Sequence, residues 1–103
     1  MAENEFKAVL KNDPTDYYAH YKLGVIYARQ GLTKKGLFKF MEAICFNRNF
    51  SKAYYNLGTI YSSKGPHLNI DKAIFFFEKY LELEPDSKQK NKIEGWLSRH
   101  KAM

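Results

Sequence analysis

The sequence predicts an all-α fold in which helix pairs stack one on the next. The segment Tyr-Lys-Leu-Gly-Val-Ile-Tyr at residues 21–27 recurs as Tyr-Asn-Leu-Gly-Thr-Ile-Tyr at residues 55–61, an offset of 34 residues. A fixed period of this length is typical of chains built from helix-turn-helix units, because a single unit cannot bury its apolar face alone. Apolar residues also recur at helical spacing along the chain, and no segment shows the alternating pattern of a strand.

Six helices joined by short connections are expected, at residues 3–12, 17–30, 33–47, 51–64, 70–83 and 87–100. The Asp13-Pro14 pair ends the first helix and lets the second begin. Gly24 and Gly58 remove the side chain at positions where two helices should cross at close range. Gly36 does the same in the third helix, at a cost of about 1 kcal/mol of helix propensity relative to alanine.

The connection at residues 65–69 contains three extra residues relative to the first repeat. Pro66 stops the fourth helix, and Asn69 or Asp71 can cap the fifth. We interpret this connection as a tolerated loop.

The last predicted helix has its own start signal and its own apolar pattern. Asp86-Ser87 supplies a helix N-cap, and Ile93, Trp96 and Leu97 then recur at helical spacing between charged and polar residues. This pattern predicts a helix that caps the C-terminal end of the stack.

The two copies share a motif of Leu-Gly-x-x-Tyr, a glycine four residues later, and a small residue and an aromatic residue on a second helix. This motif resembles the tetratricopeptide repeat. The matching residues of the first copy are Leu23, Gly24, Tyr27, Gly31, Phe40 and Ala43, and those of the second are Tyr54, Leu57, Gly58, Tyr61, Gly65, Ala73, Phe77 and Pro85. Three positions depart from the family pattern: His20 stands in place of tryptophan, and Gly36 and Tyr80 stand in place of alanine.

The resemblance implies a tetratricopeptide-like α-α solenoid, a right-handed superhelix of antiparallel helix pairs with a C-terminal capping helix. Phe6, Val9 and Pro14 fall where the end of a preceding repeat would lie. Residues 1–103 are therefore expected to form a single domain. Its parts are the second helix of a partial repeat (3–14), repeat 1 (17–50), repeat 2 with the three-residue insertion (51–87), and a capping helix with a basic tail (87–103).

Composition agrees with one folded domain, since 45% of the 103 residues are hydrophobic and 27% are charged. The longest wholly apolar stretch, residues 73–77, is far too short to span a membrane, and the N-terminus is acidic where a signal peptide is basic. We therefore expect a cytoplasmic protein. Cys45 is the only cysteine, which rules out an intramolecular disulfide.

No catalytic or metal-binding pattern is present in the sequence. His20, His67 and His100 lie far apart, and none is paired with cysteine or aspartate at the spacing of metal ligands. Phosphate-binding, dinucleotide-binding and serine-nucleophile motifs are also missing from the sequence. We expect a non-catalytic chain without a cofactor, and His20 at the edge of the core.

The resemblance also implies a binding site, because first helices of such repeats line a concave groove. The residues at groove positions are Tyr18, Tyr21, Lys22, Val25 and Arg29 in repeat 1, and Lys52, Tyr55, Asn56, Thr59 and Ser63 in repeat 2. Tyrosine offers apolar area with a polar tip, and lysine, arginine and asparagine offer donors. The expected partner is a peptide or helix of another protein, with some acidic character, and the chain would serve as a scaffold for it. The alternative is that Tyr21 and Tyr55 merely pack between repeats.

One branch of the family captures the C-terminal tail of a chaperone with a carboxylate clamp of lysine, asparagine and arginine. Lys52 and Asn56 fall at clamp-like positions, but Tyr21 and Val25 do not match. The sequence therefore does not favour that particular ligand.

A second possible interface lies on the side opposite the groove. Phe38 and Phe75 occupy positions that are usually polar, and Phe38, Met41 and Cys45 form an apolar stripe at helical spacing. Either the stripe is buried by a rearrangement of repeat 2, or it contacts a partner or a second copy of the chain. Phe6 and Val9 of the unpaired first helix suggest a homodimer through the N-terminal end.

The basic character of the chain leaves a rival function open. The net charge is +6, and residues 86–103 carry Lys88, Lys90, Lys92, Arg99 and Lys101 against Asp86 and Glu94. Beside Trp96, this end could bind nucleic acid or an anionic membrane surface. We favour a solvated capping face and regard nucleic acid as the less favoured partner.

Overall fold

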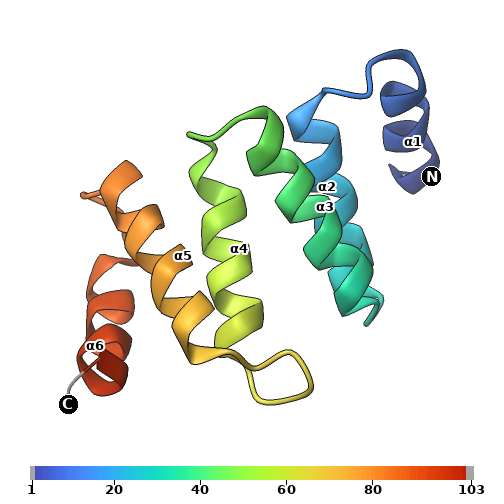
Figure 1. Cartoon of the computed structure of the whole chain (residues 1–103). Helices are drawn as coiled ribbons and strands as arrows, with labels where there is room; N and C mark the ends of the chain where they lie inside the picture. The colour runs from blue at the N-terminus through green and yellow to red at the C-terminus, as the bar shows by residue number, and fades with distance from the viewer. Residues whose placement is uncertain (1, 102–103) are drawn as a thin grey trace. The chain divides into compact units, whose positions relative to one another are not determined.

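A computed structural model describes residues 2–101, and every regular element in that range is an α-helix (Figure 1). The helices are α1 (Ala2–Asn12), α2 (Tyr17–Arg29), α3 (Thr33–Phe46), α4 (Ser51–Ser62), α5 (Ile70–Leu83) and α6 (Lys90–Lys101). The predicted all-α class is confirmed. Residues 102 and 103 of the predicted basic tail lie outside the described range.

The helix ends follow from local hydrogen bonds. The Asp16 carboxylate accepts from the Ala19 amide at 3.0 Å and caps α2, and the Asn69 side chain accepts from the Lys72 amide at 3.1 Å and caps α5. Of the two capping residues considered for α5, the cap is therefore Asn69. Gly31, with φ of 79°, ends α2 in the left-handed conformation that glycine adopts without strain.

The last helix begins three residues later than the sequence suggests, at Lys90 and not at residue 87. The Ser87 hydroxyl accepts from the Gln89 amide at 3.0 Å and also contacts the Tyr80 hydroxyl at 2.6 Å. The Lys90 amide donates to the Ser87 carbonyl at 3.1 Å. Ser87 therefore closes a turn against α5, and the helix starts only after that turn.

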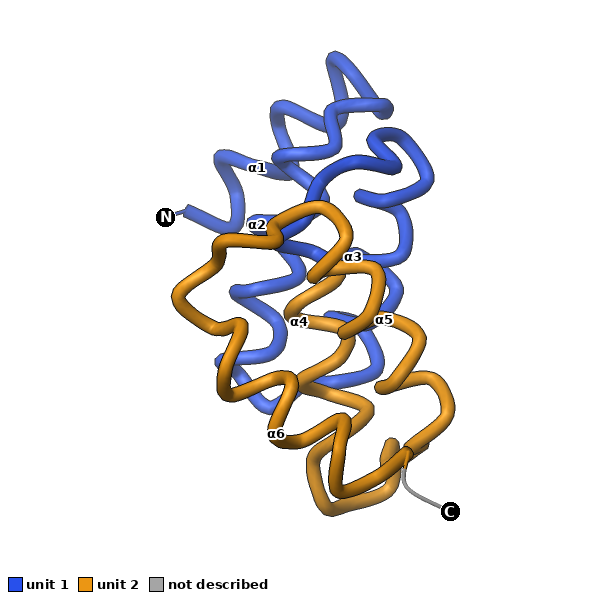
Figure 2. The backbone as a smooth tube through the Cα atoms, turned by 90° about the vertical axis from the view of Figure 1, so that its left-hand side faces the viewer, with its two compact units in different colours: residues 1–53 blue, residues 54–103 orange. Residues whose placement is uncertain are grey.

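The chain divides into two compact units, residues 1–53 and residues 54–103 (Figure 2). In the first unit, α1 packs on α2 and α2 packs on α3. Leu23 and Phe40 are each 1% exposed and form its core together with Ala19 and Ala43. A Cβ atom on Gly24 would lie 2.7 Å from the Phe40 ring, so this glycine permits the close crossing of α2 and α3.

Gly36 serves the same crossing from the other helix, since a Cβ atom there would lie 3.1 Å from the Gly24 carbonyl oxygen. The two glycines therefore face one crossing, as the sequence predicts. A side chain on Gly24 would overlap the Phe40 ring, and one on Gly36 would crowd the Gly24 carbonyl.

The second unit repeats this construction with α4 and α5 and adds α6. A Cβ atom on Gly58 would lie 2.6 Å from the Phe77 ring. Phe77, Ile93 and Leu97 are buried together, with Tyr55, Ile74, Tyr80, Leu81 and Trp96 packed against them. The apolar stripe of α6 therefore covers α5, which is the role predicted for a capping helix.

Candidate functional site

In the first unit, three of the predicted groove residues meet on α2. The Tyr21 ring lies edge-on to Phe50 at 5.0 Å between ring centroids and 6.0 Å from Phe40, and it is half-buried. Tyr18 is 48% exposed, 6.1 Å from the Tyr21 ring, and the Lys22 ammonium lies 5.9 Å from its centroid. Tyr21 is thus fixed by packing, whereas Tyr18 presents much of its ring to solvent.

The other predicted groove residues of this unit differ in their exposure. Val25 is half-buried and Arg29 is exposed; with Tyr18 and Lys22, they recur at helical spacing along one stripe of α2. Lys52 is exposed at the start of α4. The stripe combines an apolar contact surface with two basic side chains.

In the second unit, Tyr55 and Thr59 line a hollow of about 160 Å³. Its other lining residues come from three helices: Ser62 of α4, Phe77 of α5, and Lys92, Ile93 and Trp96 of α6. The predicted residues Asn56, which is half-buried, and Ser63, which is exposed, are not part of its lining. Ser62, Phe77 and Ile93 are not among the site residues that the sequence predicts. Lys92 and Trp96 are predicted only as parts of the basic end that could bind a polyanion.

The walls of this hollow are aromatic and held in place. Tyr55 packs on Tyr80 at 5.3 Å and on Phe77 at 6.1 Å between centroids. Trp96 lies edge-on to Phe77 at 5.3 Å and is stacked on His100 at 4.2 Å. The His100 Nδ1 atom is 2.8 Å from the Trp96 carbonyl oxygen, which fixes the stacked imidazole.

In the predicted second interface, Phe38 and Phe75 are exposed. Phe38 of α3 and Phe75 of α5 are each 61% exposed, so the alternative that a rearrangement buries them is wrong. Val9 is 38% exposed, Met41 is half-buried, and Phe6 is half-buried edge-on to Tyr18 at 6.5 Å. Phe6 therefore already has a partner within its own unit.

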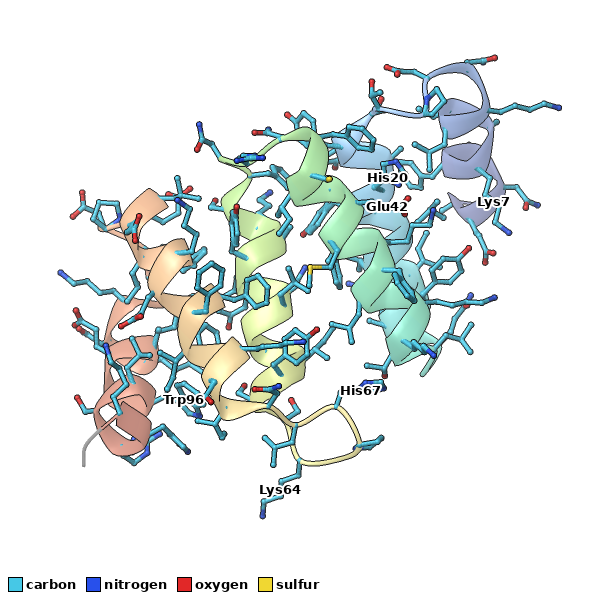
Figure 3. The ribbon with its side chains drawn as sticks, in the orientation of Figure 1. Lys7, His20, Glu42, Lys64, His67 and Trp96 are labelled. Atoms are coloured by element: carbon cyan, nitrogen blue, oxygen red, sulfur yellow. The ribbon has the colours of Figure 1, made fainter. Side chains whose placement is uncertain are left out.

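His20 lies in the first unit, where α2 meets α3 (Figure 3). It is 4% exposed, its Nε2–H donates to the Pro14 carbonyl at 2.8 Å, and its ring stacks on Phe46 at 5.5 Å. The Nδ1 atom is 3.5 Å from a Glu42 carboxylate oxygen. These contacts agree with the predicted position at the edge of the core, in the place where the family usually has tryptophan.

At the surface of the first unit, hydrogen bonds lower the pKa of two carboxyl groups. The Asp13 carboxylate accepts from the Thr15 hydroxyl at 2.7 Å and from the Thr15 amide at 3.1 Å, which lowers the pKa of Asp13. The Lys7 ammonium, 2.9 Å from Glu3, lowers the pKa of Glu3, and Gln30, the C-cap residue of α2, adds a donor at 3.4 Å. These contacts fix the turn before α2 and attach α1 to the end of α2.

Two further findings concern the described range alone. Between residues 2 and 101, no group of three or more histidine, cysteine, aspartate or glutamate side chains is arranged to hold a metal ion. None of the helices in that range is long and apolar enough to cross a membrane.

Comparison with known proteins gives the same family twice. Residues 5–38 and residues 51–87 each match a family model described as a tetratricopeptide repeat, and together the two matches cover more than half of the chain. The second match spans α4 and α5.

Two known proteins from different organisms are similar in sequence to this chain. DnaJ homolog subfamily C member 3 of Mus musculus is 25% identical over 96 residues, which cover 93% of this chain and 18% of that protein. Photosystem I assembly protein Ycf3 of Acaryochloris marina (strain MBIC 11017) is 27% identical over 100 residues, which cover 85% of this chain and 59% of that protein. The chain thus matches only part of each relative.

Repeats of this kind stack into extended binding surfaces, and proteins built from them are generally non-catalytic modules that bind other proteins. The repeated Leu-Gly-x-x-Tyr motif, the helix pairs that cross at Gly24 and Gly58, and the two matches all agree. The chain belongs to the tetratricopeptide repeat family, and it is a protein-interaction module.

Proposed function

We propose that this chain binds a peptide or helical segment of another protein along the first helices of its repeats, α2 and α4, and that it catalyses no reaction. The single observation that carries the proposal is the stripe on α2, where the half-exposed Tyr18 ring lies beside the Lys22 ammonium. Large aromatic area and cationic donors are the features that mark protein-binding surfaces. A partner with acidic residues would complement them.

The second unit supports the same proposal independently. Tyr55 and Thr59, at the positions equivalent to Tyr21 and Val25 one repeat earlier, line a hollow with aromatic walls. One of the relatives carries the word assembly in its name, which fits a role in holding other proteins. A cytoplasmic location and an acidic partner remain parts of the proposal.

A charge-reversal pair tests the groove without disturbing the core. A partner is first isolated by affinity capture from the native organism, and its dissociation constant is then measured with purified components by calorimetry. Lys22→Glu with Lys52→Glu should weaken binding at least tenfold, because both exposed or half-exposed ammonium groups lie in the predicted groove. Circular dichroism should show unchanged helix content.

The matched control is Lys34→Glu with Lys64→Glu, which changes the net charge by the same amount at exposed positions outside the predicted groove. Equal weakening by both pairs would mean that net charge decides binding and would contradict the groove. A steep loss of affinity between low and physiological salt that Lys22→Glu with Lys52→Glu leaves unchanged would favour the rival function, the binding of a polyanion through α6.

A further inference from the structure

The second unit contains a recognition site that the motif of the repeats does not specify. Its hollow of about 160 Å³ is too small for a whole small molecule, since such ligands usually occupy about 300 to 1,000 Å³. An apolar cavity of about 150 Å³ can hold one benzene ring. The hollow therefore has the size of a single bulky side chain.

The chemistry of the lining selects the kind of side chain. Three aromatic rings, Tyr55, Phe77 and Trp96, and the aliphatic Ile93 present mostly apolar surface. The Thr59 hydroxyl donates to the Tyr55 carbonyl at 3.0 Å, and the Ser62 hydroxyl donates to the Thr59 carbonyl at 3.1 Å. Both hydroxyl protons are thus used within α4, and they leave the hollow suited to an apolar occupant.

Lys92 supplies a charge at the edge of this apolar surface. It is exposed, and within residues 2–101 its ammonium has no carboxylate within ion-pair distance. Lys101, by comparison, is already paired with Glu78 of α5. The helix α6 carries four basic residues against the single acidic Glu94, so the surface around Lys92 attracts negative charge.

We propose that the hollow of the second unit anchors one bulky apolar side chain of the partner, phenylalanine or leucine, while Lys92 pairs with an aspartate or glutamate side chain beside that anchor. This inference rests on the proposed function and adds to it a partner motif. Charge complementarity argues for an acidic neighbour, and the rigid aromatic walls argue that the hollow exists before the partner arrives.

Trp96 makes the test direct, because it is the only tryptophan in the sequence and it forms part of the lining. The probes are eight-residue peptides with blocked ends and a glycine-serine background, each with a central phenylalanine flanked by aspartates. Titration of the full chain should change Trp96 emission saturably. Replacing the central phenylalanine by alanine should weaken binding roughly tenfold or more, and replacing the aspartates by lysines should weaken it several-fold.

Two variants with matched controls connect the signal to the site. Lys92→Glu should lower affinity for the aspartate-flanked peptide at least fivefold and raise it for the lysine-flanked one, whereas Lys90→Glu, the same charge change on the same helix outside the hollow, should do neither. Thr59→Phe should fill the hollow and abolish the emission change. Ser98→Phe, at an exposed position of α6 that does not line the hollow, should not.

Several results would overturn the inference. One is that no peptide changes Trp96 emission, and another is that alanine-centred and phenylalanine-centred peptides bind equally. A third is that a peptide without acidic side chains binds only when its C-terminal carboxylate is free. If the amide NMR signals of Tyr18 and Lys22 shift on addition of a peptide while Trp96 emission does not change, the hollow is not the anchor site. Binding along α2 would then still stand.

Discussion

Replacing Gly58 by alanine should destabilise the second unit, although alanine is the better helix former. The added methyl carbon would lie 2.6 Å from Cδ1, 2.7 Å from Cε1 and 3.0 Å from Cγ of Phe77. Carbon atoms are ordinarily about 3.5 to 4.0 Å apart at their best separation, so the ring must move by about 1 Å. Phe77 is 6% exposed and is contacted by Tyr55 and Trp96, which leaves it little room.

The magnitude follows from two opposing contributions to the free energy of unfolding. Overpacking of a well-filled core costs about 1 to 3 kcal/mol, and we take the upper end because a methyl group on the backbone has no alternative rotamer. The gain in helix propensity is about 1 kcal/mol. The net loss is therefore about 2 kcal/mol, equivalent to a fall in melting temperature of roughly 8 to 15 °C for a domain of this size.

Gly95→Ala is the matched control, since it makes the same chemical change in α6. Its added methyl carbon would lie 3.6 Å from the Arg99 guanidinium, an ordinary contact, so stability should rise by about 0.5 to 1 kcal/mol. Both variants are measured by urea unfolding followed by circular dichroism. In a Phe77→Leu background the cost of Gly58→Ala should shrink, because the aromatic ring is gone. A Gly58→Ala protein as stable as the wild type, or a cost unchanged by Phe77→Leu, would refute this reasoning.

The remaining predictions concern the first unit. The depressed pKa of Asp13 means that the native state prefers its carboxylate, so this contribution to stability is complete above the ordinary value of 3.8 and is lost as the pH falls through the lower native value. The free energy of unfolding, measured from about pH 5 to pH 2, should therefore depend less on pH in Asp13→Ala. An unchanged pH dependence would show that the hydrogen bonds from Thr15 do not cause it. For self-association, sedimentation at tens of micromolar should show a dimer that Val9→Glu returns to monomer, since Val9 is 38% exposed on α1. Phe38→Glu should do so only if the stripe on α3 takes part, and a monomer at every concentration would count against a homodimer.

The sequence predicts the elements whose causes are local. The glycines of the Leu-Gly-x-x-Tyr motif indicated the helix crossings, and a methyl group on Gly24 or Gly58 would lie only 2.7 Å or 2.6 Å from a phenylalanine ring. Pro14 and the capping residue Asn69 act within a few residues of themselves, so the starts of α2 and α5 could be predicted from the sequence. Asp16, the residue that caps α2, was not singled out. The start of α6 could not, because Ser87 is held by Tyr80, seven residues earlier on another helix.

The candidate site was predicted only in part for the same reason. Tyr55 and Thr59 follow from the position of the repeat, whereas Phe77, Lys92 and Trp96 reach the hollow from two other helices. Their convergence depends on how α6 packs, which no spacing along the chain reveals. The exposure of Phe38 and Phe75 was likewise undecided, since an apolar residue at a usually polar position is compatible with burial or with an interface.

The Phe77 ring lies between the α4–α5 crossing and the hollow. This position links the stability of the helix pair to its affinity for a peptide, two properties that are usually measured apart. One part of the ring sits against Gly58, and the same ring meets Tyr55 and Trp96, its fellow lining residues. A peptide that occupies the hollow binds the packed state and not the unfolded one, so its binding free energy adds to the stability of the α4–α5 pair. Changes at Gly58, which never touch the peptide, should therefore alter affinity through the placement of one ring.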